Sequence, residues 1–376
     1  MTAKRLGFFT RMLDQTDPGN RYRLGTAQIV HAEKHGFQTA WVAQHHLIEG
    51  EGGIPSPFVL LTHIAAQTST IRLGTGIVTL PLEEPLRTAE DAAVMDLLSG
   101  GRLELGVGSG GNPLAFAPFG RDVAERTQTY IDNLRILRSA LRGDVLKSAG
   151  APLLPNPIDL ARSMRDAVKA TITGEKRPPL DARLYPGRPQ LLDRMWQATF
   201  SADGGHWAGK EGDGLLLSRA QPRRPDAPHA SLADIQMPIV EAYMKALPAG
   251  RAPRIMGSRA VFVADSHDEA MRYAEIGLRR HSEHLRNVGH KKLSGTLEEM
   301  IAATDTHVGT PEEVIASLRA DTTLEHVTEL AFQVHSVDPP HELILRSIEL
   351  IASTVAPALG WQKPEAAAEM ALEPAA

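Results

Sequence analysis

A complete strand–helix–strand unit is visible in residues 71–110, which read IRLGTGIVTLPLEEPLRTAEDAAVMDLLSGGRLELGVGSG. The apolar runs GIVTL (76–80) and LELGVG (103–108) are continuous rather than alternating, which is typical of strands buried on both faces of a parallel sheet. Between the two runs, Leu86, Ala89, Ala93 and Leu97 share one face of a helix. The pair Gly100–Gly101 stands where a helix C-terminal glycine belongs, so the segment predicts a βαβ unit.

The same alternation continues along the chain in both directions. Eight apolar runs predict strands: LGFF (6–9), TAWVA (39–43), GIVTL (76–80), LELGVG (103–108), MWQATF (195–200), GLLLS (214–218), AVFVA (260–264) and ELAFQVH (329–335). Helical spacing recurs between them, for example at Tyr130, Leu134, Leu137 and Leu141, and again at Ile344, Ile348, Ile351 and Val355. The count of eight favours a single (β/α)₈ barrel over residues 1–362, with an open doubly wound sheet as the alternative.

Three segments fall outside the bare repeat. Residues 142–188, after the fourth strand, and residues 287–310, before the eighth, are expected to be insertions that build the mouth of the active site. The tail at 363–376 is expected to fray or to form a peripheral helix.

Composition narrows the class of function. Hydrophobic residues make up 42% of the 376 residues and charged residues 23%, as in a globular enzyme. A net charge of −5 with interspersed signs argues against nucleic acid or an anionic membrane as partner, and a cytoplasmic location is expected because no signal or spanning segment is evident. The chain has no cysteine, which excludes thiolate chemistry, so any redox chemistry must come from a bound cofactor.

A histidine pair follows the second predicted strand in WVAQHHL (41–47). His45 and His46 stand at the carboxyl end of the strand, the catalytic edge of a barrel, where an imidazole can act as general base or hydrogen-bond donor. Successive residues on a strand face opposite sides, so we expect one histidine in the pocket. The alternatives are that both only pack under the loop, or that they bind a metal with Glu49, although no second ligand cluster is evident.

Glycines mark two further candidate positions. Gly76, inside a buried strand, indicates either close approach of a flat ligand or relief of crowding. The run at 108–111 (GSGG) is a weak phosphate signal because it lacks the G-x-G-x-x-G spacing. Arg126 could pair with a phosphate, or it could be a solvated helix-end arginine.

The segment FSADGGHW (200–207) predicts an anion site at the start of a helix. Free N–H groups near Gly204 and the hydroxyl of Ser201 could hold a phosphate. Asp203 fits this idea poorly and is instead expected to cap the helix, which is compatible with phosphate binding.

Taken together, these segments resemble the bacterial luciferase-like flavin-dependent monooxygenases. The likeness runs from RLGFF (5–9) through most of the chain and is densest between Gly36 and Arg126. It implies reduced FMN across the carboxyl-end mouth of the barrel, with the ring near the third strand and often a cis peptide beneath it, here Gly76–Ile77. It also implies that His45 is catalytic and that FMN phosphate contacts Arg126, Ser201 and the backbone of Gly204.

Departures from the family pattern limit what the resemblance implies. Gln44 replaces a glutamate before the histidines, Gly108 a cysteine beside the flavin, and Ser109 an arginine at the phosphate, so we do not expect light emission. Without an adjacent acidic partner, the pKa of His45 is expected to be governed by burial and by the flavin, which favours the neutral imidazole.

Four functions compete. The leading hypothesis is an FMNH₂-dependent monooxygenase for a small organic substrate, served by a separate NAD(P)H:flavin reductase because the chain shows no nicotinamide-binding fingerprint. The alternatives are an F420-dependent hydride-transfer oxidoreductase, a flavin-binding protein without turnover and a metal-dependent hydrolase. We also expect a homodimer through the helices at 58–68 and 86–98.

Overall fold

A closed parallel β-barrel forms the centre of the molecule in the computed structural model, which describes residues 4–146, 165, 182–227, 230–287 and 293–361. The strands follow the order β10-β1-β2-β3-β5-β6-β7-β8, and β10 pairs with β8 to close the ring. The short β4 pairs with β5, and β9 pairs with the distal part of β8. The strands are β1 Arg5–Thr10, β2 Thr39–Val42, β3 Arg72–Thr75, β4 Val78–Thr79, β5 Leu103–Gly108, β6 Met195–Ala198, β7 Gly214–Leu217, β8 Ile255–Val263, β9 Thr306–Gly309 and β10 Glu329–Gln333.

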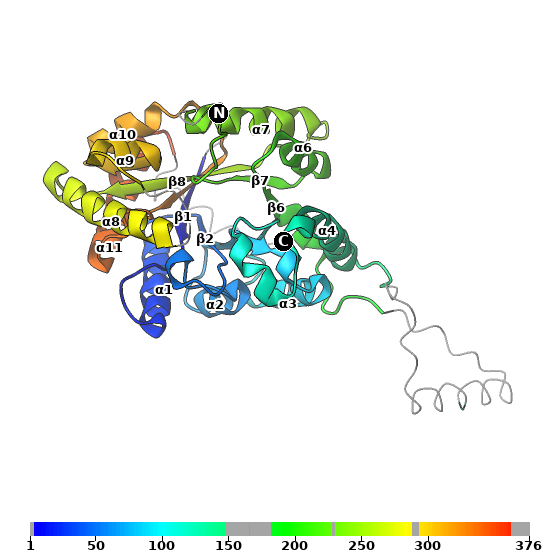
Figure 1. The fold of residues 1–376 in the computed structure, drawn as a ribbon. Coiled ribbons are helices and arrows are strands. Elements are labelled where there is room, and N and C mark those ends of the chain that lie inside the picture. The colour runs from blue at the N-terminus through cyan, green and yellow to red at the C-terminus, as the bar shows by residue number, and fades with distance from the viewer. Residues whose placement is uncertain (1–3, 147–164, 166–181, 228–229, 288–292, 362–376) are drawn as a thin grey trace.

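Helices surround the barrel on its outer side (Figure 1). Proline occupies the first helical turn of α1, α2 and α3, and capping boxes begin α7, α9 and α10. Within the described part of the chain, no helix combines the length and the apolar character needed to cross a membrane. The helices are α1 Pro18–Lys34, α2 Pro57–Ala65, α3 Pro85–Leu98, α4 Arg126–Arg142, α6 Ala202–Glu211, α7 Leu232–Ala246, α8 His267–Asn287, α9 Leu297–Ala303, α10 Pro311–Arg319, α11 His341–Leu350 and α12 Ala356–Ala358.

Two aromatic–carboxylate pairs fill the barrel interior. The indoles of Trp41 and Trp196 meet edge to face, with ring centroids 5.4 Å apart. The Trp41 indole N–H donates to Glu329 at 2.5 Å, and the Trp196 N–H donates to Glu104 at 2.7 Å. Burial raises the pKa of Glu329, although donors from Thr39 and Trp41 partly offset this. The interior is therefore a packed core that closes the barrel below the site.

The predicted (β/α)₈ barrel is confirmed, with corrections to its strands. The third strand does not span 76–80: β3 ends at Thr75, and pairing resumes at Val78 after a cis peptide between Gly76 and Ile77. The strand predicted at 260–264 begins earlier, at Ile255. The stretch 287–310 holds α9 and the unpredicted strand β9. Most of the predicted insertion 142–188 and all of the tail 363–376 lie outside the described residues.

Candidate functional site

A cavity of about 920 Å³ opens at the carboxyl ends of the barrel strands. Its volume is at the upper end of the range for small-molecule sites. The stretch 287–310 contributes Leu293, Ala303, Thr304 and Asp305 to its rim. Its lining includes Phe9, Arg11, Gln44, His45, His46, Glu51, Gly76, Ile77, Gly110, Ala198, Leu216, Arg219, Arg223, Met256, His281, His284 and His335.

Both histidines after β2 line this cavity. The His45 side chain is 21% exposed, and its Nδ1 lies 3.6 Å from Glu51 Oε2. Burial holds the pKa of His45 well below its ordinary value, and Arg11, His335 and His46 lower it further. The expectation that burial, and not an adjacent carboxylate, governs this pKa is thus supported, even though the turn at Glu49–Glu51 brings a carboxylate close to His45.

His46 is also at the cavity, so strand alternation does not remove it from the wall. Its ring packs against Phe119 with centroids 4.8 Å apart, and burial lowers its pKa. Its Nε2 is buried without a hydrogen-bond partner among the described residues.

Gln44 ties the end of β2 to the broken third strand. Its Oε1 accepts from the Thr79 N–H at 2.7 Å, and its Nε2 donates to Glu83 Oε1 at 2.7 Å. Both ends of the amide are used, so Gln44 positions the loop that follows the cis peptide Gly76–Ile77.

Glycine backbone forms the wall next to Ile77. A Cβ on Gly76 would lie 2.6 Å from the Phe9 ring, and one on Gly108 would lie 3.1 Å from Ile77 Cδ1. Gly110 has a φ of +83°, and a Cβ there would lie 2.6 Å from Thr79. Crowding therefore explains part of the glycine pattern, while Gly76 and Gly110 also present backbone to the cavity.

The residues expected to hold a phosphate lie outside the lining of this cavity. Arg126, at the first position of α4, is half-buried and makes no hydrogen bond or ion pair with the described residues. Ser201 is the N-cap of α6 and accepts from the Gly204 N–H at 3.2 Å, so the cap is Ser201 and not Asp203. Ser109 is half-buried at the end of β5. Their role toward a phosphate stays a prediction.

An acidic–basic cluster that we did not predict forms one side of the cavity. Arg11, directly after β1, donates to Glu51 Oε2 at 3.2 Å and to the Glu51 carbonyl. His284, on α8, reaches the other carboxylate oxygen of Glu51 at 3.2 Å. Glu51 thus joins His45, Arg11 and His284 at one point.

A second cluster forms where β10 ends. His335 Nδ1 lies 2.6 Å from Asp338 Oδ2, and the rings of His281 and His335 meet edge to face at 4.9 Å. Burial lowers the pKa of His281 to about 2 and holds that of His335 well below its ordinary value, so both imidazoles are neutral near pH 7. Burial raises the pKa of Asp338 to about 6.

Part of these two unpredicted clusters could have been found from the sequence, because some of their residues follow predicted strands. Arg219 directly follows the run GLLLS, Arg11 stands two residues after the end of LGFF, and the run ELAFQVH itself ends in His335. Polar residues at strand ends gather at one edge of a parallel barrel. His281 and His284 carried no comparable signal, because their positions on a helix do not reveal which way it faces.

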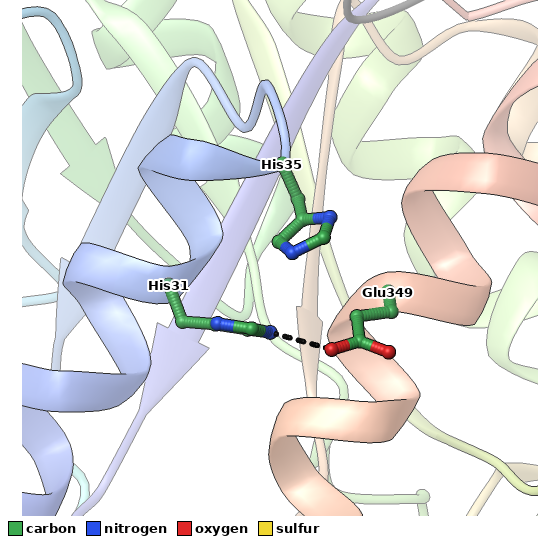
Figure 2. Close-up of side chains that lie close together, drawn as sticks. All are labelled: His31, His35 and Glu349. Atoms are coloured by element: carbon green, nitrogen blue, oxygen red, sulfur yellow. Dashed lines mark ion pairs between the residues drawn. The ribbon is translucent and has the colours of Figure 1, made fainter.

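A separate histidine cluster lies on the outside of the barrel. His31 and His35 on α1 face Glu349 on α11, and Figure 2 shows the three side chains converging. Their nearest ligand atoms lie within 4.8 Å of one another, a grouping that could hold a metal ion. His31 Nε2 already pairs with Glu349 Oε1 at 3.2 Å, and Arg346 holds the other oxygen at 2.9 Å. We predicted no metal site, and this stays a prediction; the three side chains lie where α1 meets α11.

Comparison with known proteins identifies the family. The model of the luciferase-like monooxygenases matches residues 6–324. The chain belongs to this family. It is 28% identical over 366 residues to 4-hydroxyprotoasukamycin monooxygenase of Streptomyces nodosus subsp. asukaensis, covering 90% of each chain. It is 29% identical over 115 residues to the oxygenase component of the flavin-dependent trigonelline monooxygenase of Acinetobacter baylyi, covering 30% of this chain and 32% of that one.

Solved structures share the fold of this luciferase-like protein. The oxygenating constituent of 3,6-diketocamphane monooxygenase from Pseudomonas putida, in complex with FMN, matches with a TM-score of 0.67 at 20% identity, covering 96% of this chain and 100% of that one. The F420-dependent tetrahydromethanopterin reductase of Methanopyrus kandleri matches with a TM-score of 0.61 at 18% identity, covering 94% and 99%. At these identities the likeness supports the barrel alone.

Proposed function

We propose that this luciferase-like enzyme is an FMNH₂-dependent monooxygenase of a small organic substrate, with reduced flavin supplied by a separate NAD(P)H:flavin reductase. The observation that carries the proposal is the cavity at the carboxyl ends of the strands, whose lining includes His45, Gly76 and Ile77. The trigonelline relative is the oxygenase component of its monooxygenase, which supports a separate reductase partner.

The residues present fit a flavin. Gly76 and Gly110 leave backbone exposed to the cavity, where a flat ring can approach closely. Phe9, Leu216 and Met256 give apolar surface for the ring. For the phosphate, α6 offers N-terminal N–H groups, and Arg126 offers a guanidinium that forms no ion pair with the described residues.

When bound, reduced FMN supplies the electrons that let dioxygen react with an organic substrate. The neutral His45 holds or moves a proton at Nε2, since its Nδ1 faces Glu51. Gln44 fixes the loop after Gly76 through its bonds to Thr79 and Glu83. The apolar wall keeps water from the reacting centre.

Binding and turnover measured on the same preparation test this proposal. The protein is titrated with FMN and with F420, and oxygen uptake is then followed with FMN, NADH and a separate flavin reductase over a substrate panel. We expect FMN to bind more tightly than F420 and one or more substrates to be oxygenated. Preference for F420 would support hydride transfer instead, and FMN binding without any product would support a flavin-binding protein without turnover.

A further inference from the structure

Arg219 is a buried cation without an ion-pair partner in the described structure. It follows β7, lines the cavity and is 5% exposed. A guanidinium carries five N–H donors, but the hydrogen bond found for Arg219 is a long one, from Nη1 to Ser336 Oγ at 3.4 Å. No carboxylate of the described residues lies within 4.0 Å of its nitrogens.

The nearest acidic groups are already committed to other partners. Asp338 is hydrogen-bonded to His335 at 2.6 Å. Asp305 accepts two hydrogen bonds from Arg223, at 2.7 and 2.6 Å. Arg11, which lies close enough to repel Arg219, is paired with Glu51. Arg219 is therefore left without a direct ion-pair partner among the described residues, and Asp338 and Asp305 act on it only as more distant opposite charges.

Arg219 keeps its charge near neutral pH. Burial lowers its pKa to about 9, and Arg11 contributes to the decrease, while Asp338 and Asp305 oppose it. A buried charge without a counter-charge is costly, and the neighbouring neutral imidazoles of His281 and His335 supply no negative charge. A negatively charged group bound in the cavity next to Arg219 would therefore stabilise this buried charge.

We propose that Arg219 binds the anionic group of the substrate, and that the substrate class is small organic carboxylates. The inference rests on the proposed function and specifies its substrate. A planar fork of N–H donors matches a carboxylate with two parallel hydrogen bonds. Arg219 faces the ends of β10 and β1, through Ser336 and Arg11, whereas the predicted phosphate contacts follow β5 and β6. The carboxylate and the phosphate therefore occupy different sides of the mouth.

Matched acid and amide probes test the proposal on the full-length protein. Affinities for benzoate and benzamide, and for hexanoate and hexanamide, are measured by calorimetry and by the shift in melting temperature, with and without saturating FMN. We expect each acid to bind about tenfold or more tightly than its amide, as a charge-assisted bidentate contact provides. Arg219→Met should reduce this preference to within about twofold and leave FMN affinity within about twofold.

Arg223→Met is the matched control, because Arg223 lines the same cavity but is paired with Asp305. It should keep the preference for acids. Arg219→Lys tests whether the effect of Arg219→Met comes from misfolding. It should keep part of the preference for acids, because lysine retains the positive charge but lacks the planar set of N–H donors. The proposal is overturned if the wild-type protein shows no preference for acids, if Arg219→Met keeps it, or if Arg219→Met weakens FMN binding about tenfold, which would assign the arginine to the cofactor phosphate.

The measurements without FMN do not depend on flavin chemistry. A preference for acids that persists when FMN fails to bind would contradict the proposed function and leave the anion site standing. Oxygenation of neutral substrates alone would support the proposed function and contradict the anion site at Arg219.

Discussion

His45 Nδ1 lies 3.6 Å from Glu51 Oε2, yet the imidazole is held neutral. Burial and the nearby Arg11 outweigh the carboxylate, because Arg11 itself donates to Glu51 and neutralises it. Glu51 therefore lies beside the ring without charging it, and the neutral His45 keeps a nitrogen lone pair that can accept a proton.

His45 should carry the proton chemistry and His46 should not. Because general acid–base catalysis typically contributes 10² to 10⁴-fold, His45→Ala should lower coupled turnover by roughly that factor and leave FMN affinity within about tenfold. His46→Ala should mainly lower stability through lost packing on Phe119. Turnover, peroxide release and melting temperature of both variants check this. Equal losses of turnover would contradict the assignment.

Arg126 should contribute to FMN binding. Its guanidinium is unpaired in the described structure, and Arg126→Ala should weaken FMN binding by about 1 to 3 kcal/mol, the range for a charge-assisted contact. Fluorescence titration measures the affinity, with the exposed, ion-paired Arg135→Ala on the same helix as control. Unchanged affinity in Arg126→Ala would remove it from the phosphate site.

A homodimer should form through α2 and α3. Val59 on α2 is 74% exposed, and Val94 and Leu98 on α3 are 44% and 65% exposed, so these helices present apolar surface to solvent. Light scattering should give about twice the monomer mass of 40.7 kDa. Leu98→Glu should shift the protein to monomer, whereas Ile276→Glu on α8 should not. A monomeric wild-type protein at micromolar concentration would refute this interface.

Asp96 should anchor α3 to the barrel. It is fully buried and accepts hydrogen bonds from Arg188 Nε at 2.8 Å and Arg194 Nη1 at 2.5 Å. Asp96→Ala leaves two arginines without their counter-charge and should cost about 3 to 5 kcal/mol of unfolding free energy. Asp91→Ala on the same helix breaks an exposed pair with Arg87 and should cost at most about 1 kcal/mol. Chemical denaturation measures the free energy of unfolding of both variants. An equal decrease in the two would contradict the anchoring role of Asp96.

Acid should destabilise the fold through His307. Burial lowers its pKa to about 4, with a further contribution from Arg259, so the unfolded chain binds a proton there more readily than the native one. The stability present above pH 6.5 is therefore lost as the pH falls toward 4, at about 1.4 kcal/mol per pH unit. A glutamine at this position does not titrate. Between these pH values, the free energy of unfolding of His307→Gln should therefore fall by up to about 3 kcal/mol less than that of the wild-type protein. Urea unfolding at pH 7 and pH 4.5 measures the difference, and parallel curves would exclude His307.

Local pattern was enough to predict the barrel and one side of the site. Continuous apolar runs are dictated by burial on both faces of a strand, so the eight runs predicted the number of barrel strands, although the run at 76–80 lies after β3 and the run at 260–264 covers only the end of β8. Gly36, Gly100 and Gly101 adopt positive φ, as their places at helix ends required. His45 could be placed because the end of a strand and the edge of a barrel coincide.

Only the tertiary structure shows the other side of the cavity, which Arg11, Arg219 and His335 line. Arg11, Arg219 and His335 are more than a hundred residues apart in the chain and meet because β10 pairs with both β1 and β8 to close the ring. Which carboxylate pairs with which arginine depends on that closure, since charges interact across space and leave no periodic trace in the sequence. For the same reason, the sequence shows only that Arg219 is a polar residue that follows a predicted strand. That it forms no ion pair with the described residues is seen only in the tertiary structure.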